Sequence, residues 1–156
     1  MKLNKSVEQG IYVILILALQ KDHLPLKSQL LSQRLKVSDS YLKKVLRKLV
    51  VAGLVNSSAN KDGGYTLKRP VTEISLYDIS QAVDNVGTLQ LPELHLAKQV
   101  FPGDDAHIQR SEALAHTTFQ KAQEDFNTVL KKALVSSLLE PSSYENGKID
   151  WRETDF

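Results

Sequence analysis

The sequence predicts a mainly helical protein in which three helices, a two-stranded hairpin and a fourth helix precede one much longer helix. Three observations lead to this prediction. Apolar residues recur at steps of three and four along most of the chain, as they do on one face of an α-helix. One glycine-rich stretch, Asp62-Gly63-Gly64, separates two short extended pieces. Pro141 follows the longest periodic segment and sets an end to it.

The first three helices are short and closely spaced in the sequence. We expect them at residues 6–20, from Ser28 to near Lys36, and from Ser38 to just before Gly53. Pro25 interrupts the pattern between the first two because it disfavours helix at the preceding residue. Ser28 and Ser38 stand where a side-chain oxygen can accept from the free amides at a helix start. Gly53 stands where a helix ends in a left-handed residue.

A hairpin and a fourth helix follow. The extended pieces LVNSS and YTLK are joined by a turn in which Gly63 and Gly64 supply backbone conformations that other residues adopt at a cost. Ser75 and Asp78 have the spacing of a capping box, and they predict a helix that begins after Ser75 and ends near Asn85. Residues 1–85 are therefore expected to form one domain.

The rest of the chain is predicted to be a connecting loop, a helix and a tail. Residues 86–105 lack steady periodicity, whereas residues 106–140 form a long helix whose small and apolar residues make a seam for another helix. A second copy of the chain explains this seam economically, and an intramolecular bundle is the alternative. The predicted dimer-interface residues are Ala115, Phe119, Ala122, Phe126, Val129, Leu130 and Ala133. Residues 141–156 form a polar tail that is either loose or docked on a partner, with isolated Ile149, Trp151 and Phe156.

Charge is divided unevenly along the chain. Residues 1–69 hold thirteen Lys or Arg and four Asp or Glu, whereas residues 70–156 hold seven and fourteen. A basic half joined to an acidic half is typical of an anion-binding module with a separate assembly or regulatory part. The alternative is ordinary fluctuation of charge along a chain.

The 156 residues contain no cysteine, which excludes several kinds of site. Disulfides, thiolate catalysis, thiolate zinc sites and cysteine-ligated iron–sulfur clusters all need thiols. No nucleophile elbow, phosphate-binding loop or paired-carboxylate motif is visible, so we do not expect an enzyme. The apolar run from Ile11 to Leu19 is too short to span a bilayer. We expect a soluble cytoplasmic protein that has no cofactor and does not bind a membrane.

Basic side chains gather on the third helix. Lys43 and Arg47 are four residues apart, as are Lys44 and Lys48, so two adjacent basic rows lie away from the leucines of this helix. This helix follows a short helix and a tight turn and precedes a hairpin, which is the arrangement of a winged helix. In such a domain the second helix of the helix-turn-helix enters the DNA major groove, which is about 12 Å wide. A solvated charged face is the alternative. The predicted DNA-binding residues are Ser38, Ser40, Tyr41, Lys43, Lys44, Arg47 and Lys48 on the helix, and Asn60, Lys61, Gly63 and Gly64 in the hairpin.

The sequence resembles the Rrf-two type (IscR/NsrR/CymR) family of winged helix-turn-helix transcription regulators. The resemblance is carried by VSDSYLKKVLRKLVVAGLVNSSANKDGGYTL and the following TEISLYDISQAVD. Its most specific pieces are SYL at 40–42, GLV at 53–55, GGY at 63–65 and the helix after Ser75. The resemblance implies a homodimer crossed through the long helix, with two recognition helices in successive major grooves and two wings at minor grooves.

The chain departs from this family at three places. Many relatives ligate an iron–sulfur cluster through three cysteines in the loop after the fourth helix, and the matching segment VGTLQLPELHLAKQVFPGDDAH has none. Several relatives place an arginine before the glycines of the wing, where this chain has Ala59, Asn60 and Lys61. Near the start, NKSVEQG leaves Lys2 and Lys5 as candidate contacts to the DNA backbone.

The loop after the fourth helix allows two further readings. His95, Asp104, Asp105 and His107 carry nitrogen and oxygen atoms that suit a metal, but their spacing matches no tight motif. We read them as solvent-exposed loop residues and assign no metal ligand. The apolar residues of the loop line either a small-molecule pocket or ordinary packing, and they are Leu89, Leu91, Leu94, Leu96, Val100 and Phe101.

These observations predict a homodimeric, sequence-specific DNA-binding regulator. We expect a repressor that reads an imperfect palindrome and responds to a small-molecule or protein effector that the sequence does not identify. An alternative from another class is a winged-helix interaction module whose basic helix docks on an acidic protein partner. A third reading is DNA compaction without sequence specificity.

Overall fold

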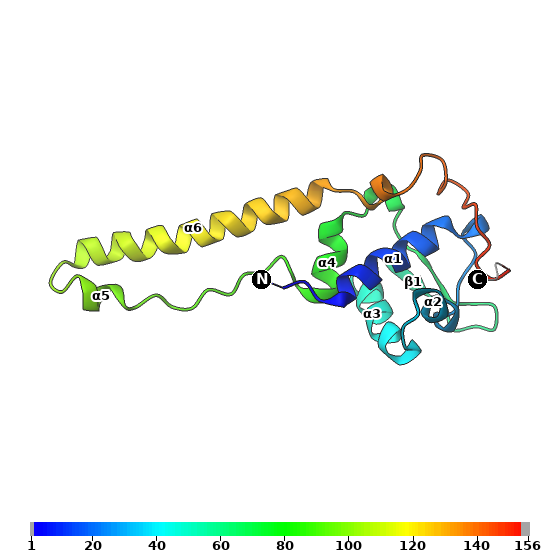
Figure 1. Cartoon of the computed structure of the whole chain (residues 1–156), viewed down its shortest axis with the longest axis horizontal. Helices are drawn as coiled ribbons and strands as arrows, with labels where there is room; N and C mark the ends of the chain where they lie inside the picture. Colours follow the sequence, from blue (N-terminus) through cyan, green and yellow to red (C-terminus); the bar gives the residue numbers. More distant parts are fainter. Residues whose placement is uncertain (1, 154–156) are drawn as a thin grey trace. The chain divides into compact units, whose positions relative to one another are not determined.

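The structure, a computed structural model that describes residues 2–153, confirms the mainly helical class predicted from the sequence. Its contacts divide the chain into two units: the chain up to Val86 together with the chain from Leu130 onward, and Gly87–Val129. The elements follow in the order α1 (Lys5–Leu19), η1 (Lys21–His23), α2 (Ser28–Leu35), α3 (Asp39–Val51), β1 (Val55–Ser57), β2 (Tyr65–Leu67), η2 (Val71–Glu73), α4 (Leu76–Asp84), α5 (Ala97–Val100), α6 (Asp105–Lys132) and η3 (Val135–Leu138) (Figure 1).

Helix α1 is the central element of the first unit. It packs on α2, α3, α4 and β2, and its residues from Val13 to Ala18 are buried throughout. Gly10 allows α1 to approach α4 closely, because a Cβ atom at that position would lie 2.9 Å from Cγ2 of Ile79. The wide apolar face predicted for the first helix is therefore covered on nearly all sides within the same chain.

Helices α2 and α3 are joined by a tight turn at Lys36, which adopts the left-handed conformation with φ of 53°. Ser38 caps α3, as predicted, by accepting a hydrogen bond from the amide of Tyr41 at 3.3 Å. The prediction that Ser28 caps α2 is wrong. Ser28 is the first residue of the helix, and the capping position is held by Lys27, whose side chain makes no capping bond.

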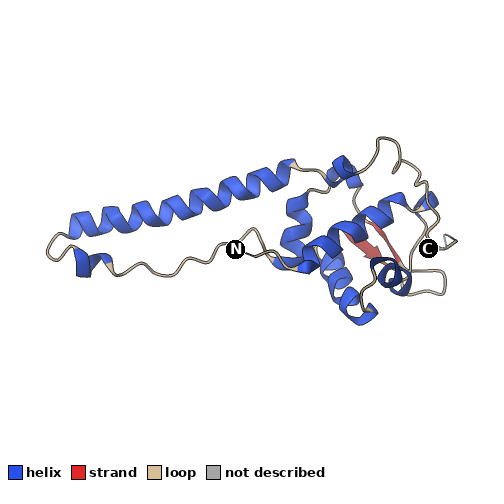
Figure 2. Ribbon diagram, viewed as in Figure 1, coloured by secondary structure: helices blue, strands red, loops and turns tan. Residues whose placement is uncertain are grey.

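The two strands lie side by side and run antiparallel (Figure 2). Val55 lies opposite Leu67, and Ser57 lies opposite Tyr65. Leu26 forms a further antiparallel bridge to Tyr65. Gly64 is required at this point because a Cβ atom there would lie 2.5 Å from the carbonyl oxygen of Leu26. Glycine thus lets the hairpin dock on the segment that precedes α2.

Helix α4 begins and ends as predicted. The Ser75 hydroxyl accepts from the amide of Asp78 at 3.1 Å, and the Asp78 carboxylate accepts from the amide of Ser75 at 2.8 Å, which completes the capping box. Asn85 ends the helix in the left-handed conformation, and its amide donates to the carbonyl of Gln81. Both ends of α4 are therefore fixed by local sequence.

The helix predicted over residues 106–140 ends well before Pro141, the residue expected to stop it. Helix α6 stops at Lys132, and Leu134 is extended. The chain turns here to pair with the residues before α4: the amide of Val135 donates to the carbonyl of Ile74 at 2.8 Å. The side chain of Val135 is fully buried. This pairing and burial replace the helical bonds that the last turns would have made.

As far as residue 153, the polar tail docks on its own chain, which is neither of the two outcomes expected for it. We call residues 142–153 the strap. The amides of Lys148 and Ile149 both donate to the carbonyl of Leu19, and the carbonyl of Ile149 accepts from Lys21. The indole nitrogen of Trp151 donates to the carbonyl of Ile16 at 3.0 Å. Phe156 lies outside the described residues.

The second unit contains α5 and most of α6. Near the start of α6, the rings of Phe101 and His107 meet edge to face with centroids 4.1 Å apart. The side-chain amide of Asn127 donates to the carbonyl of Gly87 at 3.0 Å. None of the described helices is long and apolar enough to cross a membrane.

Candidate nucleic-acid interface

Helix α3 divides its residues cleanly between core and solvent. Leu42, Val45, Leu46 and Leu49 are at most 2 % exposed and pack in the core. This spacing follows the helical period, so the intervening polar residues must face outward. The outward face is the one on which the sequence places the basic rows.

The first turn of α3 presents groups that suit an anion. Ser38 uses its side chain to hold the amide of Tyr41, and Ser40 and Tyr41 are exposed. The amides at a helix start carry partial positive charge and favour phosphate oxygens. These predicted residues therefore lie together at one end of the basic face.

The four basic residues of α3 are not equivalent. Nζ of Lys43 lies 2.7 Å from a carboxylate oxygen of Asp39, one turn earlier. The hydrogen bond between them lowers the pKa of Asp39 and raises the pKa of Lys43, so both stay charged and partly neutralise each other. Within residues 2–153, Lys44 and Arg47 form no salt bridge and are exposed. Of the four basic residues of α3, they are the most available to phosphate.

Lys48 points to another part of the same unit. Its Nζ atom donates to the carbonyl oxygen of Val83 at 2.7 Å, in the last turn of α4. A cation at this place satisfies a carbonyl that the helix leaves unbonded and complements the helix dipole. Lys48 therefore joins α3 to α4, a contact that four-residue spacing does not reveal.

A groove of about 550 Å³ runs beside the exposed face of α3. It brings Lys2 and Lys5, from the start of the chain, next to Tyr41, Lys44 and Lys48 of α3. The start of the chain is held there by Asn4, whose amide donates to the carboxylate of Asp84 at 3.0 Å and whose side chain also bonds to it. The sequence suggested Lys2 and Lys5 as backbone contacts, and they lie at the same groove as Lys44.

The hairpin, the candidate wing, has an exposed tip and a buried base. Asn60 and Lys61 are exposed, as a DNA-contacting wing requires. Gly63 and Gly64 are buried, so they shape the turn and are not presented on its surface. Lys27, which sequence reasoning missed, supports the tip because its Nζ atom donates to the carbonyl of Lys61 at 3.0 Å. No spacing pattern links Lys27 to a turn more than thirty residues away.

The loop of the second unit holds no assembled metal site. Across residues 2–153, no three His, Asp or Glu side chains lie close enough to share a metal ion. His95 bonds to the carbonyl of Glu93, and His107 packs on Phe101. Loop residues around Leu94 do line two cavities against α6, of about 490 and 410 Å³.

Comparisons with known sequences match this chain to transcriptional regulators, as the arrangement of α3 and the hairpin would suggest. Residues 3–141 match the model of the Rrf2 family, described as an iron-dependent transcriptional regulator. YwgB of Bacillus subtilis, a predicted HTH-type transcriptional regulator, is 33% identical over 152 residues, which cover 96% of this chain and 93% of that protein. BadM of Rhodopseudomonas palustris, also a predicted HTH-type regulator, is 30% identical over 96% of this chain and 88% of its own length.

Solved structures with a similar fold include proteins described as regulators. CymR, the global cysteine regulator of B. subtilis, is 21% identical and superposes with a TM-score of 0.62 over 88% of this chain and 95% of its own. A predicted transcriptional regulator from Listeria innocua is 27% identical with a TM-score of 0.62, covering 91% and 88%. Helix α3, the hairpin and the family match together show that this chain belongs to the Rrf2 family of transcriptional regulators and carries a winged helix-turn-helix DNA-binding domain.

Proposed function

We propose that the protein is a homodimeric, sequence-specific repressor that acts in the cytoplasm on an imperfect palindrome with half-sites about one helical turn apart. The observation that carries this proposal is a pair of exposed cations, Lys44 and Arg47, on a capped helix beside a basic groove; neither forms a salt bridge with another residue in the range 2–153. An exposed cation on a recognition helix is available to phosphate oxygens and to guanine edges.

Helix α6 supports the dimer. It has 28 residues, and several of its apolar side chains are open to solvent in the single chain: Leu114 is 70% exposed, Phe119 53% and Val129 67%. Burying such residues against a second copy removes apolar surface from water. Ala133 falls one residue beyond the helix, where its carbonyl accepts from the amide of Leu76, so we leave it out of the proposed seam.

An iron–sulfur cluster does not fit the residues of this chain. Clusters in proteins are held mainly by cysteine thiolates, with histidine at some positions, and the sequence contains no cysteine. The loop after α4 places no alternative set of three metal-binding side chains together within the described residues. We therefore propose that the regulator responds to an effector of another kind, either a small molecule or a protein.

Selection of bound sequences from a random DNA pool, with the full chain, tests the proposal. We expect enrichment of a two-fold motif whose halves are about one helical turn apart. Binding without any enriched motif would identify a DNA-compacting protein instead. The absence of DNA binding, together with binding to an acidic protein, would identify an interaction module, which the exposed but arginine-free wing tip allows.

The dimer is tested by a charge placed on the proposed seam. Phe119→Glu should convert the dimer to a monomer in sedimentation equilibrium, because a carboxylate cannot be buried there without a partner. Gln120→Glu is the matched control, since Gln120 is the next residue on α6 and is also exposed. An unchanged dimer in Phe119→Glu would place the interface elsewhere.

A further inference from the structure

The strap closes one side of a cavity in the DNA-binding unit. Its course is fixed at several points: the Asp22 amide donates to the carbonyl of Asn146, and the Trp151 amide donates to the fully buried side chain of Gln20. Gly147 passes so close to the C-terminal end of α1 that a Cβ atom there would overlap the carbonyl oxygen of Gln20, the residue that follows the helix. The strap is thus an ordered wall of this unit.

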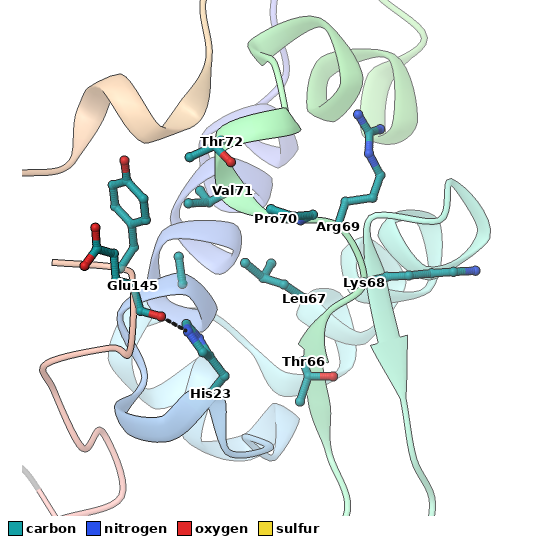
Figure 3. Close-up of a pocket in the computed structure, with 11 residues that line it drawn as sticks. His23, Thr66, Leu67, Lys68, Arg69, Pro70, Val71, Thr72 and Glu145 are labelled. Carbon is teal, nitrogen blue, oxygen red and sulfur yellow. Dashed lines mark hydrogen bonds between the residues drawn. The ribbon is translucent and has the colours of Figure 1, made fainter. Parts of the chain in front are cut away.

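Between the strap and the base of the hairpin lies a cavity of about 590 Å³, which we call the strap cavity. Figure 3 shows it between Glu145 on one side and the chain from Thr66 to Thr72 on the other. The chain from Thr66 to Thr72 leads from strand β2 toward η2 and α4. A ligand here would contact both the strap and the connection between the wing and α4.

Apolar groups make most of the surface of this cavity. Ala18, Leu67, Pro70, Val71 and Tyr144 line it, and Val71 is only 4% exposed. A volume of this size falls in the range of about 300–1,000 Å³ that accommodates small organic ligands. The lining therefore favours a ligand with an aromatic or branched aliphatic body.

Arg69, one of the charged residues that line the cavity, is engaged elsewhere. Arg69 donates to the carbonyl of Glu73 and lies 3.7 Å from the carboxylate of Asp78. In Figure 3 the side chains of Lys68 and Arg69 extend away from His23. The His23 ring bonds to the carbonyl of Glu145 at 3.1 Å. Because burying an uncompensated charge among apolar groups is costly, the ligand should be neutral.

The edge of β2 that faces away from β1 offers hydrogen bonds to such a ligand beyond its bridge to Leu26. Tyr65 exchanges both of its backbone bonds with Leu26, on the side away from β1. Backbone groups alternate sides along a strand, so the N–H and C=O of Leu67, two residues on, also point away from β1. Since Leu67 lines the strap cavity, these groups give a polar anchor within an apolar site.

We propose that the strap cavity is the effector site of this regulator and binds a small neutral molecule with an aromatic or branched aliphatic body. This assignment deepens the proposed regulatory function and rests on it. A ligand that contacts both the strap and the chain from Thr66 to Thr72 changes how these two segments pack. Because the ligand site and the DNA site are linked, that change lowers the affinity for DNA.

Indole is a suitable probe because it is planar, apolar and neutral, and indole-3-acetate is its charged counterpart. Methyl resonances of Leu67 and Val71 in the full chain should shift in a saturable manner with indole. Indole-3-acetate should bind about tenfold more weakly or not at all, because its carboxylate meets apolar groups. Shifts that spread without saturation, or equal binding of both compounds, would overturn the assignment.

A pair of tryptophan substitutions tests the location. Thr72 is exposed and lines the cavity, whereas its neighbour Glu73 is exposed and does not. Thr72→Trp should abolish the indole-dependent shifts, and Glu73→Trp should leave them unchanged. Persistence of the shifts in folded Thr72→Trp would move the site elsewhere. If Thr72→Trp does not fold, the saturable methyl shifts of the unaltered chain decide the location.

The regulatory role is tested with the DNA recovered by selection. Saturating indole should weaken operator binding by about fivefold or more, a usual size for coupling between two sites. Thr72→Trp, which fills the cavity, should weaken operator binding even without indole. Indole binding with unchanged DNA affinity would overturn the effector role and leave the DNA-binding function intact. A selection that recovers no motif would instead overturn the proposed function.

Discussion

Nζ of Lys48 lies 2.7 Å from the carbonyl oxygen of Val83, and this bond ties the recognition helix to the end of α4. The contact separates Lys48 from Lys44, which the sequence places on the same basic row. Lys44 faces the groove without an ion pair among residues 2–153, whereas Lys48 already has a partner within the chain.

Replacing each lysine by methionine should separate stability from DNA binding, because methionine keeps an apolar stem and removes the ammonium group. Lys48→Met should lower the free energy of unfolding by about 1 kcal/mol through the lost bond at a helix end. Lys44→Met should leave stability unchanged and reduce the salt slope of DNA binding by about one for each subunit. Urea unfolding and salt titrations measure both, and an equal loss of salt slope in the two variants would contradict this assignment.

Arg47→Lys tests whether Arg47 reads bases or only phosphates. The substitution keeps the charge but removes the planar group that bonds guanine in two places. If Arg47 reads a base, operator binding should weaken by about 1–3 kcal/mol while non-specific binding is retained. Arg110→Lys, at an exposed position on α6, is the control. Equal losses on operator and random DNA would indicate a phosphate contact alone.

Gly147 and Gly53 form a matched pair for testing the strap. Both have positive φ, 65° and 73°, so alanine strains the backbone at either place. Among the described residues, an added Cβ would meet another group at Gly147, namely the carbonyl of Gln20, whereas none of them lies within 4 Å of a Cβ at Gly53. Gly53→Ala should lower the free energy of unfolding by about 1 kcal/mol. Gly147→Ala should lower it clearly more. Equal losses in urea unfolding would mean that the strap contributes nothing to stability.

Asp150 makes the strap sensitive to acid. Hydrogen bonds from Arg152 and Gln20 lower the pKa of the Asp150 carboxyl. The folded state thus binds the proton less tightly than the unfolded state, whose aspartate pKa is about 3.9. The resulting stabilisation is present above about pH 4 and is lost as the pH falls through the lowered folded value.

The measurement is urea unfolding of the unaltered chain and Asp150→Asn from neutral pH to about pH 3. The difference in stability between the two proteins should shrink as the pH falls below about 4. Glu93→Gln, at an exposed loop position, should show no such change. A difference that is constant with pH would remove Asp150 from the stabilising contacts.

Local signals in the sequence predicted much of the DNA-binding unit. Ser38 and Ser75 cap their helices because a hydroxyl at that position reaches amides within the next three residues. Gly53 takes the left-handed conformation after α3 for an equally local reason. The exposed positions of Lys44 and Arg47 follow from helical period alone.

Other features depend on contacts between distant residues. Pro141 suggested that the long helix continues to residue 140, but pairing of Val135 with Ile74 ends it at Lys132. Trp151, an isolated apolar residue in a polar tail, reaches the carbonyl of Ile16. Each contact joins residues that are far apart in the sequence, so periodicity and spacing contain no sign of it.

The sequence by itself determined the order of the elements, the buried stripe of α3, the basic face opposite to it and the lack of any thiol ligand. These follow from residue identity, helical period and capping, which act over a few residues. Only the tertiary structure decided that Lys48 holds α4, that Gly63 and Gly64 are buried, and that the strap closes a cavity against the hairpin. Those outcomes depend on which backbone carbonyls and apolar surfaces meet after folding, and the free energy of that packing outweighs local preference.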